Sequence, residues 1–206
     1  MIKIFKKMAK ILREEIKNNS ENLEFTNVTP YFPELSDLEQ PRDIEIKLHN
    51  LDLKMVNSNT FKTAVSLSSK CDKSKLEFKI KFLEGNLDLY VAYNGNDANG
   101  YFVIESSELD KVRLQNDNGD IVISRISADT LDVKNDNGDI VIESVHSQMV
   151  DLSSSNGDIV VTPANDSKLI LEAGNGDIVK NGVRSNSNSG YIIKCATQNG
   201  DIVLKK

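Results

Sequence analysis

The sequence predicts an all-β fold, a single-stranded, right-handed parallel β-helix (β-solenoid) with coils of about 19 residues, preceded by a short N-terminal amphipathic helix. Three observations predict it. The tripeptide Asn-Gly-Asp occurs five times in the second half of the 206-residue chain, at steps of 19, 19, 19 and 24 residues. Apolar residues alternate with polar ones on both sides of each copy, which is the period of a strand with one buried face. A helical spacing of apolar residues appears at the N-terminus.

Residues 1–19 are predicted to form a basic amphipathic helix, because Phe5, Met8, Leu12 and Ile16 recur at helical spacing. Residues 1–17 carry six basic and two acidic side chains, a net charge of +4, against −10 for the remainder. Such a helix can lie on an anionic membrane surface or pair with a partner, and it can equally cap the solenoid or act as a tether. The side chains for membrane or partner contact are Lys3, Phe5, Lys6, Lys7, Met8, Lys10, Leu12 and Arg13.

Residues 20–42, which contain three prolines, are predicted to be a linker or an edge strand, and residues 43–206 the solenoid. Within it, residues 43–109 are expected to form irregular coils, since terminal coils must close the core and are commonly atypical. Two stretches there, starting at Asn50 and Asn86, keep an Asn-x-Asp-apolar frame related to the later repeats.

Residues 110–206 carry the regular repeats, with two predicted strands in each. The columns expected to face inward are Val112 and Leu114, Leu131 and Val133, Val150 and Leu152, Leu169 and Leu171, Ile193 and Cys195 before the turns, and Ile121, Ile140, Ile159, Ile178 and Ile202 after them. Stacked coils place like residues about 4.8 Å apart. The last strand, Asp201–Lys206, ends in two lysines, a typical device against edge-to-edge pairing.

Each Asn-Gly-Asp is interpreted as a corner between two strands. Asn and Gly tolerate positive φ, and Asp accepts hydrogen bonds from local backbone N–H groups. The corner residues are Asn118, Gly119, Asp120, Asn137, Gly138, Asp139, Asn156, Gly157, Asp158, Asn175, Gly176, Asp177, Asn199, Gly200 and Asp201.

These tandem NGDIV corners, preceded by strands such as "LDLKMV" and "LDLYVAY", resemble the bacterial "putative adhesin" family of β-strand-repeat proteins, a domain of unknown function common in Gram-positive bacteria. The resemblance covers roughly residues 43–206. It implies a right-handed parallel β-helix and an association with the cell envelope or its stress responses. It implies no catalytic residues.

The corner aspartates have two interpretations. A ladder of Asp120, Asp139, Asp158 and Asp177 offers hard oxygen ligands of the kind that Ca²⁺ binds. A single Asp after each Asn-Gly also serves turn hydrogen bonding, and the denser glycine-aspartate pattern of calcium-binding β-rolls is missing. The sequence indicates no other cofactor.

A stripe of valines falls between the inward positions and is expected to point outward. In one interpretation these β-branched residues simply favour strands, and a loop or the N-terminal segment covers them. In the other, the stripe is a docking face for a partner or for a second copy of the chain. Its members are Val122, Val141, Val160, Val179 and Val203.

Other chemistry is weakly supported. The formal charge of −6 and the lack of a basic tract in the repeats argue against nucleic-acid binding. Cys71 and Cys195 offer neither a disulfide framework nor a Cys-x-x-Cys site, and His49 and His146 lie in unrelated contexts. No nucleophile motif or phosphate loop is present. We therefore expect no enzymatic activity.

The first residues contain too many lysines for a signal peptide, and no apolar stretch has the length of a membrane span, which predicts the cytoplasm or the cytoplasmic membrane surface; the resemblance implies the cell envelope. The function expected is a noncatalytic, adhesin-like β-solenoid scaffold or binding module of the bacterial envelope with a protein partner. The alternative is a cytoplasmic or membrane-surface regulatory protein that binds a protein partner through its coils. A polysaccharide-acting enzyme is the remote third alternative, because parallel β-helices include polysaccharide lyases and hydrolases. Fold alone, however, supplies no activity.

Overall fold

The computed structural model describes residues 25–28, 41–57, 62–68, 71–95, 100–106 and 109–206. Within these ranges the chain forms strands and one 3₁₀ turn, Lys73–Lys75, and no α-helix. The prediction of an all-β fold is confirmed. The helix predicted for residues 1–19 lies outside the described residues, as does most of the segment 20–42.

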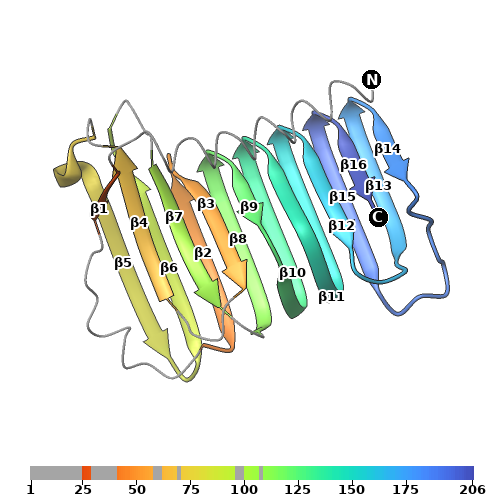
Figure 1. Cartoon of the computed structure of the whole chain (residues 1–206), viewed down its shortest axis with the longest axis horizontal. Helices are drawn as coiled ribbons and strands as arrows, with labels where there is room; N and C mark the ends of the chain where they lie inside the picture. Colours follow the sequence, from red (N-terminus) through yellow and green to blue (C-terminus); the bar gives the residue numbers. More distant parts are fainter. Residues whose placement is uncertain (1–24, 29–40, 58–61, 69–70, 96–99, 107–108) are drawn as a thin grey trace.

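The strands lie side by side along the long axis of the molecule (Figure 1). They are β1 (Phe25–Val28), β2 (Asp43–His49), β3 (Asp52–Asn57), β4 (Lys62–Ser68), β5 (Leu76–Leu83), β6 (Asn86–Tyr93), β7 (Gly100–Ser106), β8 (Leu109–Asn118), β9 (Ile121–Ile123), β10 (Ile126–Asn137), β11 (Ile140–Asn156), β12 (Ile159–Pro163), β13 (Lys168–Asn175), β14 (Ile178–Asn181), β15 (Ile192–Asn199) and β16 (Ile202–Lys205).

Hydrogen bonding arranges these strands in two rows. Row one is β5-β6-β2-β8-β10-β11-β15-β13, and row two is β1-β4-β7-β3-β9-β11-β12-β16-β14. The long strand β11 belongs to both: its first residues pair with β9 and β12, and its last residues pair with β10 and β15. Each coil therefore contributes one strand to each row.

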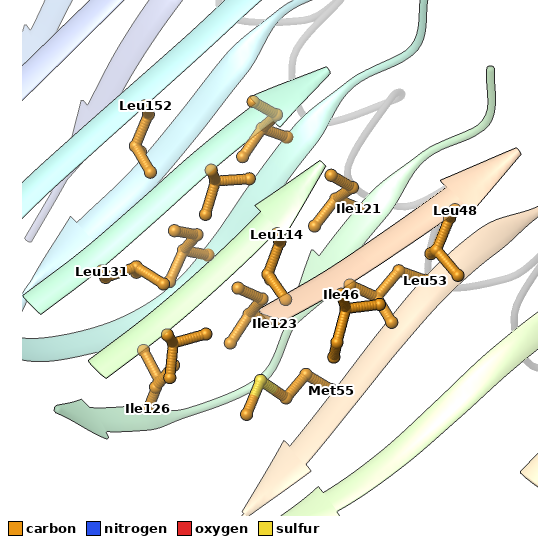
Figure 2. Packing of buried hydrophobic residues seen from close by; sticks show 14 of the residues in the cluster. Ile46, Leu48, Leu53, Met55, Leu114, Ile121, Ile123, Ile126, Leu131 and Leu152 are labelled. Carbon is orange, nitrogen blue, oxygen red and sulfur yellow. The ribbon is translucent and has the colours of Figure 1, made fainter. Parts of the chain in front are cut away.

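The core lies between the two rows because the alternation of the sequence sends every second side chain inward. Leu131 of β10 pairs with Val112 on one side and Val150 on the other, so each neighbour occupies the same place in the adjacent repeat. Leu131, Val112 and Val150 are each 0% exposed. Figure 2 shows Leu114 of β8 beside Ile121 and Ile123 of β9, in the space between the rows. Each such side chain contributes about 1.5–3 kcal/mol on burial.

The coils do not stack in the order of the sequence. The last coil, β15–β16, lies between β11–β12 and β13–β14: Ile193 pairs with Val150 on one side and Leu169 on the other. The longest step between corners contains the loop from Gly182 to Tyr191, which carries the chain past one coil. The final strand β16 is therefore internal, with β12 and β14 as neighbours. The prediction that its lysines protect a sheet edge is wrong.

The opposite end of the stack has the same arrangement. The coil β2–β3 lies between β8–β9 and the later coil β6–β7. Antiparallel strands then complete this end: β5 pairs with β6, β4 pairs with β7, and β1 pairs with β4. The frame at Asn86 is not a corner, because Asn86 begins β6 directly after the tight turn at Glu84 and Gly85, whose φ angles are 53° and 81°. Only the frame at Asn50 joins the corners.

Hydrogen exchange tests this order of coils. A C-terminal strand usually frays and exchanges quickly. Because β16 is paired on both sides, we expect the amides of Ile202 to Leu204 to exchange more slowly than those of Ile178 to Asn181 in β14, which pairs on one side with a strand of the described residues. Faster exchange in β16 than in β14, measured by NMR or mass spectrometry, contradicts the arrangement.

Candidate functional site

The corner aspartates form a continuous ladder along the stack. In each corner Oδ1 of the aspartate accepts a hydrogen bond from the backbone N–H of the aspartate in the next coil. The Asp139 N–H donates to Asp120 Oδ1 at 2.9 Å, and the Asp158 N–H donates to Asp139 Oδ1 at 2.8 Å. The ladder starts at Asp52 and ends at Asp177, which donates to Asp201. Each of these carboxylates except the last therefore has a fixed partner.

The corner asparagines form a second ladder in the same direction. The Asn137 Nδ2 donates to Asn118 Oδ1 at 3.0 Å, and Asn156 donates to Asn137 at the same distance. Asn50 is the first acceptor, and Asn175 the last donor. Because every side-chain amide donates toward the β5 end of the stack, the ladder has a direction, and its acceptor groups face the β13–β14 end.

The corner glycines are needed for the close approach of neighbouring coils as well as for the turn. Gly119, Gly138, Gly157 and Gly200 have positive φ, at 121°, 130°, 153° and 153°. A Cβ on Gly119 would lie 2.6 Å from the Leu51 carbonyl oxygen, and one on each later corner glycine would lie even closer to the carbonyl oxygen of the adjacent corner glycine. A side chain at these positions therefore collides with backbone of the next coil.

A column of buried polar residues supports the corners, and the sequence reasoning missed it. The Asn135 Nδ2 donates to the Gly119 carbonyl at 2.9 Å, and Thr197 Oγ1 donates to the Gly157 carbonyl at 3.0 Å. The signal was present, because each repeat has a residue three before its corner glycine that continues the inward alternation. The column consists of Asn116, Asn135, Ser154 and Thr197, all at most 5% exposed.

Burial and neighbouring charges act on the aspartate ladder. Burial raises the pKa of Asp139, and the charges of Asp120 and Asp158 raise it further, while the hydrogen bond from the Asp158 N–H opposes them. Among the described residues no group of three or more His, Cys, Asp and Glu is placed to hold a metal ion. The calcium ladder therefore stays a prediction, whereas the hydrogen-bonding role of the same oxygens has explicit partners.

The histidines and cysteines do not converge on one site. His49 lies 2.9 Å from the Asp117 carboxylate, through Nδ1. His146 instead contacts the side chain of Asn165 and the ring of Tyr191. Burial raises the pKa of Cys195 to about 12, so its thiol stays protonated and unreactive. Cys71 is buried in the irregular coils, at the β5 end.

A pocket of about 540 Å³ lies beside the loops at the β13–β14 end. Its walls include Asp166, Arg184 and Lys206, together with apolar and amide side chains. Acidic, basic, amide and apolar side chains thus line the same surface depression.

The valine stripe lies on the outer face of row two. Val122, Val141, Val160 and Val179 are partly buried, and Val203 is 1% exposed. They are aligned in register across β9, β11, β12, β16 and β14. The basic side chains proposed for membrane or partner contact, between Lys3 and Arg13, lie outside the described residues.

The comparisons with known proteins agree with this fold. A crystal structure of a "putative cell adhesion protein" from Clostridium sporogenes ATCC 15579 has a TM-score of 0.61 at 16% identity, covering 88% of this chain and 97% of that one. A "putative adhesin" from Bacteroides fragilis NCTC 9343 has a TM-score of 0.36 at 14% identity, covering 81% and 94%, which is too distant to support an argument.

The model of one family, Toastrack DUF4097, matches residues 15–205. No curated protein matches the chain. Within the described residues, no helix has both the length and the hydropathy that a bilayer crossing requires.

Replacing Gly138 by alanine tests the close approach at the corners. Positive φ alone makes such a change destabilising by about 1 kcal/mol or more. The collision with the Gly119 carbonyl adds to this cost. We expect a free energy of unfolding lowered by more than about 1 kcal/mol. Gly190→Ala is the matched control, since a Cβ there meets nothing within 4 Å. Equal effects of the two changes in denaturant unfolding contradict this role.

Two substitutions of Asp139 separate hydrogen bonding from charge. Asp139→Ala leaves the partly buried Asp158 N–H without its acceptor and should lower the free energy of unfolding by about 1–3 kcal/mol. Asp139→Asn keeps an oxygen acceptor and removes the repulsion from Asp120 and Asp158, so its stability at pH 7 should equal or exceed that of the unchanged chain.

The pH dependence checks the same pair. A carboxyl whose pKa is higher in the folded chain than in the unfolded chain binds its proton more tightly when folded. The Asp139 carboxylate therefore lowers the free energy of unfolding when it is ionised, and this cost disappears as the pH falls toward the ordinary pKa of an aspartate. Any advantage of Asp139→Asn at pH 7 should therefore shrink on acidification. An Asn variant less stable than the Ala variant contradicts the argument. A thermal shift with calcium that Asp139→Asn abolishes would favour the metal interpretation.

Proposed function

The chain belongs to the Toastrack DUF4097 family, and we propose on that premise that it is a noncatalytic binding scaffold of the bacterial cell envelope. The observation that carries the proposal is the aspartate ladder. The repeated corner carboxylates accept backbone hydrogen bonds at about 2.8 Å from coil to coil. Their role is to hold a rigid stack, and a rigid stack is a support for binding surfaces.

The finer architecture is part of the same proposal: a right-handed parallel β-helix in which one sequence repeat forms one coil. The constant offset of one repeat between β8, β10 and β11 supports it, as does the alternation of each coil between the two rows. The offset is larger where β15 lies beside β11, which makes the coil β15–β16 the exception.

A protein partner is proposed to bind the β13–β14 end of the stack. Strand β13 pairs with β15 and β14 pairs with β16, and the outer edges of both have no further strand among the described residues. Ile178 is 42% exposed although its register partner Ile202 is 0% exposed. Ile170 on β13 is 45% exposed. A partner that adds a strand here completes the hydrogen bonding and buries these side chains.

The other end of the stack favours solvent. Its outer strand β5 is antiparallel to β6 and carries exposed Lys79 and Lys81, which discourage edge-to-edge pairing. The start of β13 is partly covered, since the Leu169 N–H donates to Ser185 Oγ and the Asn186 N–H donates to the Ser167 carbonyl. The open edge for a partner is therefore the second half of β13 together with β14.

The proposed envelope association is supported by the name of the solved protein from Clostridium sporogenes, which refers to cell adhesion. The protein partner and the compartment are tested together by photo-cross-linking in the bacterium that makes the protein. A cross-linking amino acid at Ile178 should give a defined adduct with another protein in the envelope fraction. The control position is Lys134, exposed on β10 in the middle of row one.

Two outcomes contradict the proposed function. Equal adducts from Ile178 and Lys134, or none from either, remove the β13–β14 end as a binding site. A protein recovered wholly in the cytosolic fraction removes the envelope and favours the regulatory alternative.

A further inference from the structure

We propose that the valine stripe is the docking surface for the N-terminal segment of the same chain, residues 1–17, lying along row two as an amphipathic helix. The stripe comprises Val122, Val141, Val160, Val203 and Val179, in the order in which their strands follow one another. Four observations support this occupant: cover at one end of the stripe, length, reach and charge.

The outer face of row two is covered near β16. Ile202 and Leu204 belong to the core cluster and Val203, between them, does not, so Val203 faces away from the core. It is nevertheless 1% exposed. On the neighbouring strand, outward Val179 is partly buried whereas inward Ile178 is exposed. Residues on a bare outer face would show the opposite order, which indicates that this part of the stripe is covered.

The helix and the stripe have the same length. Five valines on neighbouring strands span four strand spacings, about 19 Å. The apolar face of residues 1–17 runs from Phe5 to Ile16, which is about 17 Å at 1.5 Å per residue. Each valine therefore has an apolar side chain of the helix within reach along the stripe.

The connection to β1 fixes the direction of the helix. Strand β1 begins at Phe25 and is four strand spacings, about 19 Å, from β9 in row two. The seven residues 18–24 extend to at most about 25 Å. They can bring Ile16 to Val122 on β9, but they are too short to bring Ile16 to Val179 on β14, at the far end of the stripe. Phe5 then lies over Val203 and Val179, where the cover is observed.

The charges are complementary. Each valine follows a corner aspartate by two residues, so the stripe runs beside the row Asp120, Asp139, Asp158, Asp201 and Asp177. Residues 1–17 carry a net charge of +4, with lysine and arginine flanking the apolar face. On this surface the apolar face of a basic amphipathic helix contacts the valines, and its basic side chains lie near the carboxylates. While docked, the helix presents no apolar face to a membrane or to another protein.

Disulfide formation between paired cysteines tests the docking and its direction in the full chain. Phe5→Cys with Val179→Cys, and Leu12→Cys with Val141→Cys, should each form an intramolecular disulfide at least about tenfold faster than two controls. In the first control, Phe5→Cys with Val122→Cys, the second cysteine lies at the opposite end of the stripe. In the second control, Leu12→Cys with Lys134→Cys, the second cysteine lies on the outer face of row one.

The outcomes are distinct. Equal rates in all four chains overturn the proposal, because a loose tether samples every surface. Disulfides formed only between two molecules overturn it in favour of a second copy on the stripe. As a measurement without cysteines, Val141→Asp should speed amide exchange of Phe5 to Ile16 at least about tenfold while the β-sheet circular dichroism is unchanged; unchanged exchange overturns the docking. None of these readouts involves Ile178, so the partner site proposed above can fail independently.

Discussion

The whole structure depends on how closely the backbones of neighbouring corners approach. At each corner the glycine Cα lies against the carbonyl oxygen of the adjacent corner, where a Cβ does not fit. This contact fixes how the corners of neighbouring coils are aligned. The same alignment then places each Asp Oδ1 beside an N–H, each Asn amide beside the next Asn, and each inward Ile above the next. Glycine thus sets a register that three other kinds of contact share.

A shared register explains why polar side chains are abundant at the corners of the described coils. The carboxylate of Asp120 and the amide of Asn118 each have a partner in the next coil. Inside, Asn135 and Thr197 satisfy corner carbonyls that a tight turn would leave buried and unpaired. These groups are fixed by hydrogen bonds between neighbouring coils. The stripe on row two and the β13–β14 end are the surfaces that the ladders do not use, and both are proposed above as binding surfaces.

Much of this was predictable from the sequence, because period and alternation report local geometry. The corners and the inward columns around Leu131 follow from spacing alone. The order of the coils did not follow. If the coils stacked in sequence order, Val150 would pair with Leu169, but in the structure it pairs with Ile193. Leu169 and Ile193 are both aliphatic and occupy the same position in their repeats, so the sequence pattern does not distinguish them. The polar column was missed because burial of Asn135 depends on a carbonyl in another coil, which no single repeat reveals.

The displaced last coil makes the far end of the stack cooperative. Strand β13 pairs with β15, and β14 pairs with β16, so the described contacts join residues 168–181 to the rest of the stack through residues 192–205. During synthesis β13 and β14 therefore lack the strands that they pair with in this structure until the C-terminal residues have been made. In a solenoid that stacks in sequence order, each coil can add to its predecessor as it emerges. Here the last two coils must add together, and the open edge of β13–β14 exists only once residues 192–205 are in place.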